Sequence, residues 1–574
     1  MQQATNLPKK SERNFVPNDL DTNSWAALEP YFFQLENKSI QTLPELQQWL
    51  KDWSELETVV SENARWLYVH TTLDTANVDA RNALINMYQH IQPQLSTWDN
   101  KLAKKFVASP AIDELDKNLF HTTIRKVKKG LELFREENVA LNSQQVMLQS
   151  KFGEITGAQS IQYNGQEITL QQAGVYQRSS NRAQREEVFK LVNNRLQQDS
   201  ESLDTLLTEL IALRHKIATN AGYQNFIEYR FDELGRFDYT PEDCLRFHEA
   251  AKDVIVPLMA AMNEEKRQKL GLDVMRPWDM NAEPGGEAPL SPSTSGEDLL
   301  EKTIACFREL DPYFAERIEI MREMKYLDLE SRLNKSPGGY NMTMPEIGVP
   351  FIFMNSANSE HDLITMVHEG GHAIHTFLSH PLELYAFKEI TSEIAEVASM
   401  SMELMTMDYW HIFYNKPEEL KRAKKNHLQY ILGILSRTCM GDSFQFWLYS
   451  NPNHTVEERR QKWAELNKQF TGSNADWSGY ENVLATGYQR ILHFYEVPFY
   501  YIEYAFAELG AIAVWKNFKN NPKQAVEDYK KALSLGFTAP IPVFYETAGA
   551  KFDFSKEYVA ELAQFVQEEL KKLN

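Results

Sequence analysis

Residues 366–375 read Met-Val-His-Glu-Gly-Gly-His-Ala-Ile-His, and this stretch decides how the rest of the chain is interpreted. It contains the pattern H-E-x-x-H, which places His368 and His372 one turn apart on the same face of a helix. Two imidazoles at that spacing can bind one metal ion, and the neighbouring Glu369 can activate a water molecule for attack. The pattern therefore predicts a catalytic metal site on a helix.

The residues around this motif are mostly apolar, so we expect its helix to be buried. The apolar neighbours are Leu363, Ile364, Met366, Val367, Ala373, Ile374, Phe377 and Leu378. Burying two histidines and a glutamate there is costly unless a partner such as a metal ion compensates them. Gly370 and Gly371 each cost about 1 kcal/mol relative to alanine inside a helix. Their presence favours a close approach of substrate or of another helix to this backbone.

The composition limits the classes of partner and compartment. The chain has 574 residues and a formal net charge of -20, so nucleic acid and anionic membranes are poor partners. The three cysteines, Cys244, Cys306 and Cys439, are too few and too far apart for a disulfide framework or a thiolate zinc site. No signal-peptide pattern is found, and no apolar run reaches the roughly 18 residues that a membrane span needs. We expect a soluble, cytoplasmic protein.

Residues 1–150 are expected to form an N-terminal helical region. After a polar arm over residues 1–22, apolar side chains recur at three- and four-residue spacing, as at Leu46, Trp49 and Trp53. Few glycines or prolines interrupt this pattern, which predicts long antiparallel helices.

The period of the pattern changes between residues 151 and 200. Asn164-Gly165 stands between Ile161–Tyr163 and Ile168–Leu170, and this arrangement is a strong signal for a β-hairpin. A linking helix is expected to follow the hairpin.

Residues 201–574 are expected to form the metal-binding catalytic region. Helical periodicity dominates it, with a helix start at Thr240-Pro241. The apolar run from Val349 to Asn355, bounded by proline and asparagine, predicts a strand that leads into the metal helix. The whole pattern predicts a mainly α fold with a small β-sheet near the metal.

A catalytic zinc needs a third protein ligand and one open position. One zincin layout, with a third histidine six residues after the second and a glycine between them, is excluded because Leu378 and His375 occupy those positions. The other layout takes a glutamate from a later helix, and residues 389–403 contain several. Spacing leaves Glu393 and Glu396 as rivals and favours Glu396, which lies deeper in the apolar run.

The pattern H-E-x-G-H-x-x-H, followed by E-V-A-S, resembles the thimet oligopeptidase and oligoendopeptidase F family of zinc peptidases. The resemblance implies one Zn²⁺ held by His368, His372 and Glu396, the ligand set of a gluzincin. It also implies that Glu403 orients a ligand imidazole. The strong motifs cover residues 338–505.

Two further segments carry the resemblance on the amino-terminal side of the motif. Gly338-Gly339-Tyr340 resembles the family's glycine-rich loop, and residues 351–355 resemble its active-site strand. The resemblance implies that Gly338, Gly339, Tyr340 and Phe353 bind substrate.

A carboxy-terminal segment resembles the family's H…Y-x-x-Y pattern. His493 matches the histidine that contacts substrate, and Tyr504 matches the tyrosine that stabilises the transition state. Tyr501 is the next match, with Tyr500 as the alternative if the register shifts by one. Another tyrosine of the family pattern is replaced by valine or proline here, so that contact is missing or replaced.

Together, the motif and the resemblance imply a zinc metalloendopeptidase that hydrolyses internal bonds of short oligopeptides, with water activated by zinc and Glu369. The resemblance implies helical layers enclosing a deep channel that admits short peptides and excludes folded proteins. Two alternatives remain: a catalytically silent peptide-binding protein on the same fold, and a zinc exopeptidase. The intact Glu369 argues against the first, and the second lacks an identifiable group to anchor a free terminus.

Overall fold

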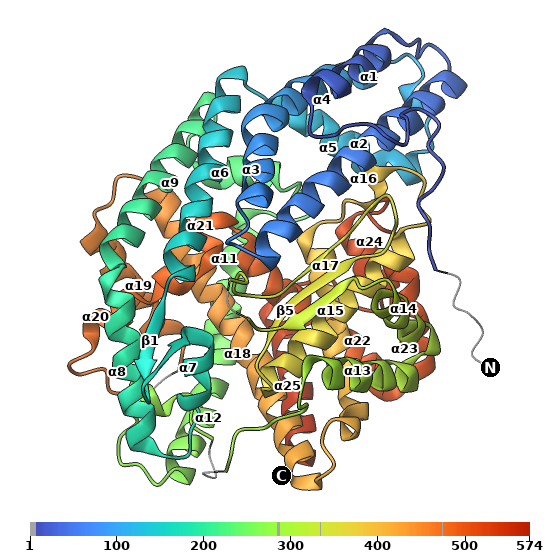
Figure 1. The fold of residues 1–574 in the computed structure, drawn as a ribbon. Helices are drawn as coiled ribbons and strands as arrows, with labels where there is room; N and C mark the ends of the chain where they lie inside the picture. Colours follow the sequence, from blue (N-terminus) through green and yellow to red (C-terminus); the bar gives the residue numbers. More distant parts are fainter. Residues whose placement is uncertain (1–6, 284–286, 333, 473–474, 574) are drawn as a thin grey trace.

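The computed structural model describes residues 7–283, 287–332, 334–472 and 475–573, and most of them are helical (Figure 1). The mainly α fold with small sheets that the sequence predicts is confirmed. Within the described ranges, each helix is too short or too polar to traverse a lipid bilayer.

The N-terminal region consists of long helices, as expected. They are α1 (Trp25–Asn37), α2 (Leu43–Leu73), α3 (Val78–Asn86), α4 (Gln92–Val107), α5 (Lys117–Leu133) and α6 (Glu136–Gly157). Helix α2 begins with a capping box formed by Thr42 and Glu45 and buries Leu46 and Trp49 on one face. These side chains belong to a hydrophobic cluster that the N-terminal helices share.

The predicted β-hairpin is present and confirms the turn signal. Strands β1 (Ser160–Tyr163) and β2 (Gln166–Thr169) pair antiparallel. Asn164 and Gly165 connect them with φ values of 52° and 76°, as a two-residue hairpin turn requires.

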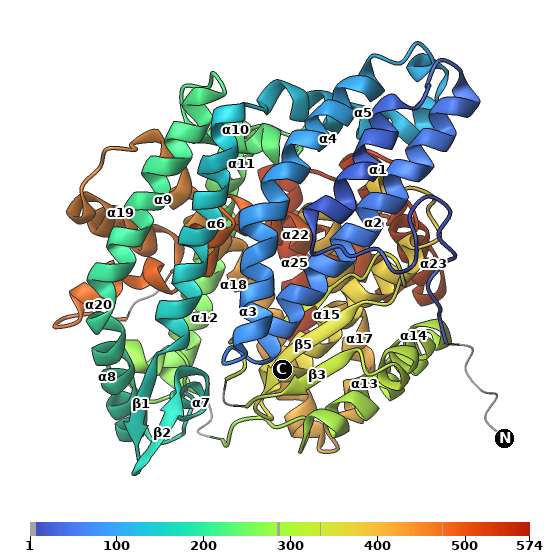
Figure 2. The same cartoon turned by 45° about the horizontal axis from the view of Figure 1, so that its top comes forward.

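Eight helices follow the hairpin. They are α7 (Leu170–Tyr176), α8 (Arg182–Gln198), α9 (Ser200–Asn220), α10 (Phe226–Glu233), α11 (Pro241–Ala250), α12 (Val256–Lys269), α13 (Gly296–Leu310) and α14 (Pro312–Glu323). Figure 2 shows α9 side by side with α6 of the N-terminal region, whereas α13 and α14 pack near α15. Helix α11 begins at Pro241 with Thr240 as its cap, where the sequence predicts the start.

A three-stranded sheet leads into the helix that carries the H-E-x-x-H motif. Its order is β3 (Leu327–Glu330), β5 (Phe351–Ser356) and β4 (Tyr340–Met342), with β5 parallel to β3 and antiparallel to β4. Helix α15 (Glu360–Ser379), which carries H-E-x-x-H, starts four residues after β5. The predicted strand is therefore confirmed.

The remaining helices follow α15 along the chain, and some of them pack against it. They are α16 (Tyr385–Lys388), α17 (Ser392–Thr406), α18 (Pro417–Ser450), α19 (Val456–Phe470), α20 (Glu481–Ala485), α21 (Leu492–Glu496), α22 (Glu503–Asn520), α23 (Pro522–Leu533), α24 (Ile541–Thr547) and α25 (Lys556–Lys572). Helix α17 packs against both α15 and α22. At the closest point, a Cβ added to Gly371 would lie 2.6 Å from the Cα of Ser399. A second helix therefore explains the need for glycine there.

The described part of the N-terminal arm crosses between α2 and the segment before β5. Lys10 forms ion pairs with Glu62 of α2, at 2.9 Å, and with Glu346, at 2.5 Å. Arg13 pairs with Glu346 at 2.6 Å. The arm therefore ties the N-terminal helices to the sheet region by charge.

Candidate metal centre and active site

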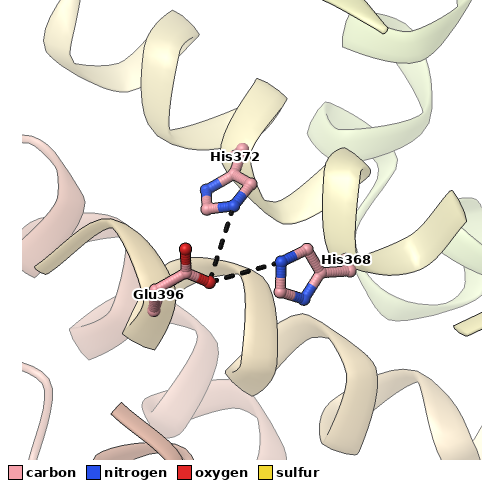
Figure 3. Close-up of side chains that lie close together, drawn as sticks. All are labelled: His368, His372 and Glu396. Atoms are coloured by element: carbon pink, nitrogen blue, oxygen red, sulfur yellow. Dashed lines mark ion pairs between the residues drawn. The ribbon is translucent and has the colours of Figure 1, made fainter. Parts of the chain in front are cut away.

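The structure brings His368, His372 and Glu396 together (Figure 3). Their ligating atoms all lie within 4.8 Å of one another. The Nε2 atoms of His368 and His372 lie 3.3 and 3.8 Å from Glu396 Oε2. Helix α15 supplies both imidazoles from one face, and the adjacent helix α17 supplies the carboxylate.

This donor set fits zinc. Two histidines and one glutamate form a catalytic ligand set that leaves one position open for water or substrate. His368 turns its other ring nitrogen, Nδ1, towards Glu403 Oε1 at 2.6 Å, which leaves Nε2 free to face the cluster. An ion between these atoms would compensate charges that are otherwise buried side by side.

Glu403 lies where it can orient His368, as the resemblance implies. It is 5% exposed, and its second oxygen lies 3.5 Å from Nε2 of His427 on α18. A single histidine in an apolar stripe carries no sequence signal for such a contact. His368, Glu403 and His427 therefore form a row of polar side chains that runs away from the cluster.

Glu369 is a buried carboxylate beside the cluster. It is 6% exposed, and its Oε2 has no hydrogen-bond partner among the described residues. Burial raises the pKa of Glu369 to about 7. A carboxylate with a free oxygen in such a site can accept and release a proton.

His493 and Tyr504 face each other next to this cluster. His493 Nε2 lies 3.3 Å from the Tyr504 hydroxyl. Burial, followed by the negative charges of Glu396 and Glu369, raises the pKa of Tyr504 well above its ordinary value. Tyr504 therefore keeps its proton and can donate a hydrogen bond.

Tyr500, rather than Tyr501, reaches the ligand set. The Tyr500 hydroxyl donates to Glu396 Oε1 at 2.5 Å. The Tyr501 ring instead covers Gly441, where an added Cβ would lie 2.5 Å from a ring carbon. The catalytic role assigned to Tyr501 stays a prediction, and the geometry favours the alternative register.

The glycine-rich loop runs into the edge strand β4. Gly338 has a φ of 98°, and the chain then pairs with β5 from Tyr340 onward. The side-chain amide of Asn341 donates to the backbone carbonyl of Glu369 at 3.2 Å, so β4 lies directly beside the base. This contact could not be predicted from the sequence, because a single asparagine in a short strand carries no signal for it.

Phe353 is buried within the sheet, and the substrate contact expected of it stays a prediction. It is 0% exposed, because it lies in the central strand under the ring of Tyr340, with ring centroids 4.8 Å apart. Tyr340 itself is half-buried, and its hydroxyl is hydrogen-bonded to Thr72 of α2 at 2.6 Å. Phe353 therefore supports Tyr340 from beneath.

Glu393 lies outside the cluster and is bound elsewhere. Its carboxylate accepts a hydrogen bond from Tyr239 and lies 3.7 Å from Nε of the buried Arg236. Arg236 also pairs with Glu503 at 2.6 Å. The choice of Glu396 over Glu393, which spacing left open, therefore agrees with what each carboxylate contacts.

Two cavities reach residues close to the cluster. The larger, of about 1020 Å³, is lined in part by His361 and Ile364 of α15 and by Tyr430 of α18. The smaller, of about 410 Å³, is lined in part by Gly338 and Leu492. Neither cavity is lined by His368, His372 or Glu396.

Comparisons with known proteins agree with this geometry. A family model described as peptidase family M3 matches residues 175–564, and one described as peptidase M3 N-terminal domain matches residues 17–134. An oligoendopeptidase F homologue of Borreliella burgdorferi is 22% identical over 80% of this chain and 77% of its own length. Matches to the other curated relatives span between 32% and 65% of those relatives' length.

Solved structures share the fold over nearly the whole chain. A structure of Pz peptidase A with an inhibitor superposes with a TM-score of 0.92 at 25% identity, covering 97% of this chain and 99% of that one. An oligoendopeptidase F structure gives the same TM-score and identity, covering 98% and 99%.

Proposed function

The chain belongs to peptidase family M3, and on that premise we propose that it is a zinc-dependent endopeptidase that hydrolyses internal bonds of short oligopeptides. The convergence of His368, His372 and Glu396 beside the unpaired carboxylate of Glu369 carries the proposal. The relatives named oligoendopeptidase F support the substrate class. The cytoplasmic location expected from the sequence stays a prediction.

In this proposal His368, His372 and Glu396 hold one Zn²⁺. The bound ion supplies Lewis acidity that polarises a peptide carbonyl and a water molecule. Glu403 holds the ring of His368 in orientation through its Nδ1 contact. Tyr500 restrains the Glu396 carboxylate in the same way through its other oxygen.

Proton transfer is assigned to Glu369. Its free oxygen takes a proton from the attacking water and passes it to the leaving amine. Tyr504 and His493 donate hydrogen bonds to the oxygen that becomes negative as the carbonyl is attacked. Each donor of this kind contributes about 2.7–4 kcal/mol to the barrier reduction in other hydrolases.

Substrate binding is assigned to the edge strand β4 and to the loop before it. An edge strand offers unpaired backbone groups to which an extended peptide can add as a further strand. The contact of Asn341 with the carbonyl of Glu369 would hold that peptide close to the base. Gly338 and Gly339 leave the approach free of side chains.

We also propose three regions along the chain. Residues 1–150 form the N-terminal helical region, 151–200 the hairpin with its linking helix, and 201–574 the catalytic region. A separate hydrophobic cluster in α1, α2, α4 and α5 supports the first, and one around the hairpin supports the second, while Leu148 of α6 packs in the largest cluster. The largest cluster, which includes α15, α17 and α22, supports the third.

Glu369→Gln tests the proposal because it removes the base and keeps the shape of the side chain. We expect a bound-zinc content equal to that of the parent and a kcat lower by about 10²–10⁴-fold on an internally quenched oligopeptide. Glu568→Gln, an exposed residue of α25, is the matched control. A chelator should abolish parent activity, and added zinc should restore it.

The same experiment separates the alternatives. Undiminished turnover by Glu369→Gln would contradict the assigned mechanism. A zinc-loaded parent that binds peptide without cleaving it would indicate a binding protein. Mapping the products of a peptide blocked at both ends decides between endopeptidase and exopeptidase, since only an endopeptidase cleaves it.

A further inference from the structure

The N-terminal helices enclose a cavity of about 380 Å³ that shares no lining residue with the metal centre. Helices α2, α4 and α5 each contribute one face to it, and the segment around α16 closes one side. The apolar part of the lining includes Leu50, Phe106, Phe120 and Leu384. The volume suits a small organic molecule or one end of a larger one.

Two carboxylates interrupt this apolar lining. Glu57 of α2 and Asp99 of α4 line the cavity and are half-buried, and neither carboxylate forms a hydrogen bond or an ion pair with a described residue. Lys126 acts on Glu57 by its charge, but its ammonium lies 4.9 Å from the centre of the Phe537 ring and pairs with neither acid. Burial raises the pKa of Glu57 and that of Asp99, the latter to about 7. Carboxylates that are partly removed from water and have no partner are unfavourable.

The cavity also contains unpaired hydrogen-bonding groups. Trp53 and Thr123 line it and are 9% and 7% exposed. Trp53 Nε1 and Thr123 Oγ1 have no hydrogen-bond partner among the described residues. Trp53 lies one turn before Glu57 on α2, so an indole donor and a carboxylate share one face of that helix. A buried indole N–H without an acceptor costs free energy that a ligand oxygen would recover.

We propose that this cavity binds an α-ammonium group that carries a neighbouring carbonyl and an apolar side chain. Glu57 and Asp99 accept from the ammonium, and the carbonyl accepts from Trp53 Nε1 or from the Thr123 hydroxyl. The side chain packs on the apolar lining. A free carboxylate at the carbonyl position is disfavoured because it would lie close to the two acids. The chemistry fits an amino-acid amide or the amino terminus of a peptide.

The proposed site is independent of peptide hydrolysis. Glu57, Asp99, Trp53 and Thr123 come from α2, α4 and α5, whereas α15 and α17 supply the candidate zinc ligands. Binding should therefore persist when zinc is removed, so that failure of the ammonium site and failure of the proposed peptidase function give different results.

Isothermal titration of the full chain with phenylalaninamide at pH 7 and in chelator tests the proposal. An α-amino group is still largely protonated at that pH. We expect saturable binding at one site. N-acetylphenylalaninamide, which keeps the side chain and the carbonyl but has no positive charge, should not bind. Equal binding of the acetylated compound, or no binding of phenylalaninamide, would overturn the site.

Variants locate the binding. The double variant Glu57→Gln with Asp99→Asn should bind phenylalaninamide at least about tenfold more weakly than the parent. This is the effect expected for the loss of a charge-assisted hydrogen bond. Asp113→Asn removes an exposed charge from the same region and should bind like the parent. Parent-like binding by the double variant would contradict the assignment. If that variant does not fold, the acetylated compound still decides the question on the parent.

A third ligand distinguishes the two sources of the ammonium. Phe-Gly-Gly-amide presents the same group at the end of a peptide. If it binds as tightly as phenylalaninamide, the occupant is a peptide amino terminus. If only phenylalaninamide binds, the cavity accepts a small amino-acid amide but not a peptide. The proposed ammonium site is then supported for small amides alone.

Discussion

Tyr500 and Tyr501 are neighbours in sequence, but their side chains have different surroundings. The hydroxyl of Tyr500 donates to Glu396, while the ring of Tyr501 packs over Gly441 and near Phe494. Phe499, just before them, has a φ of 67°, which is rare for a residue with a side chain. This break in the backbone precedes the tyrosine whose hydroxyl reaches Glu396.

Replacing each tyrosine separately distinguishes them. Tyr500→Phe should weaken zinc binding by about 10–100-fold, because it removes a hydrogen bond that orients the ligand Glu396. Tyr501→Phe should leave zinc affinity unchanged, because no described residue bonds its hydroxyl. Zinc affinity can be measured by competition with a chromogenic chelator. The opposite pattern would restore the register in which Tyr501 is the functional residue.

At this scale the sequence predicts the ligands better than the groups around them. His368 and His372 follow from a spacing that a regular helix converts directly into proximity. The tyrosines follow a break between α21 and α22, and a helical count from His493 cannot cross the left-handed residue Phe499. The contact of Asn341 with Glu369 depends on tertiary packing alone.

Helices α15 and α17 approach each other closely enough that side chains must be absent at one point. A Cβ on Gly371 would lie 2.6 Å from the Cα of Ser399 and 2.7 Å from the carbonyl oxygen of Ala398. Both are backbone atoms of α17, so a side chain at residue 371 fits only if that helix moves. A Cβ on Gly370 would meet the side chain of Phe307 instead, which is easier to displace.

Gly371→Ala should therefore separate the two helices that supply the proposed zinc ligands. We expect a cost of about 1–3 kcal/mol from overpacking, together with weaker zinc binding because Glu396 moves with α17. Gly153→Ala in α6 is the matched control, since no atom lies within 4 Å of its added Cβ. It should be neutral or slightly stabilising. Thermal unfolding and metal analysis of both proteins measure these effects, and a parent-like Gly371→Ala would contradict the close-contact argument.

Element prediction succeeds where a local signal exists. The Asn164-Gly165 turn, the cap at Thr240 and the apolar strand before α15 all have short-range causes and occur where expected. The sequence does not predict which helix lies against Gly371, because helix packing depends on partners that are distant along the chain.

Across the whole molecule, the N-terminal arm joins regions that are far apart in sequence. Arg13 and Lys10 both pair with Glu346, which is 8% exposed. Burial alone would raise the pKa of Glu346, but these two cations hold it below its ordinary value of 4.5. The carboxylate therefore stabilises the fold when it is ionised.

Glu346→Gln should lower the thermal midpoint at pH 7 by about 1–4 °C. A lowered folded-state pKa contributes stability above the unfolded value, and this contribution is lost as the pH falls through the folded value. The difference in thermal midpoint between parent and variant should therefore be largest at pH 7 and should shrink below about pH 4.5. Glu383→Gln, from an exposed pair with Lys51, should show little difference at either pH. A difference that grows on acidification would contradict the assignment.

The packing of α15, α17 and α22 has a consequence for the order in which the protein is made. His368 leaves the ribosome well before Tyr504, by about 7 to 27 seconds at ordinary rates of translation. The nascent chain therefore holds both histidines before it holds the tyrosine assigned to the transition state. The helices that enclose the N-terminal cavity are translated earlier still. If the proposed function holds, hydrolytic capacity would be among the last properties that the chain acquires.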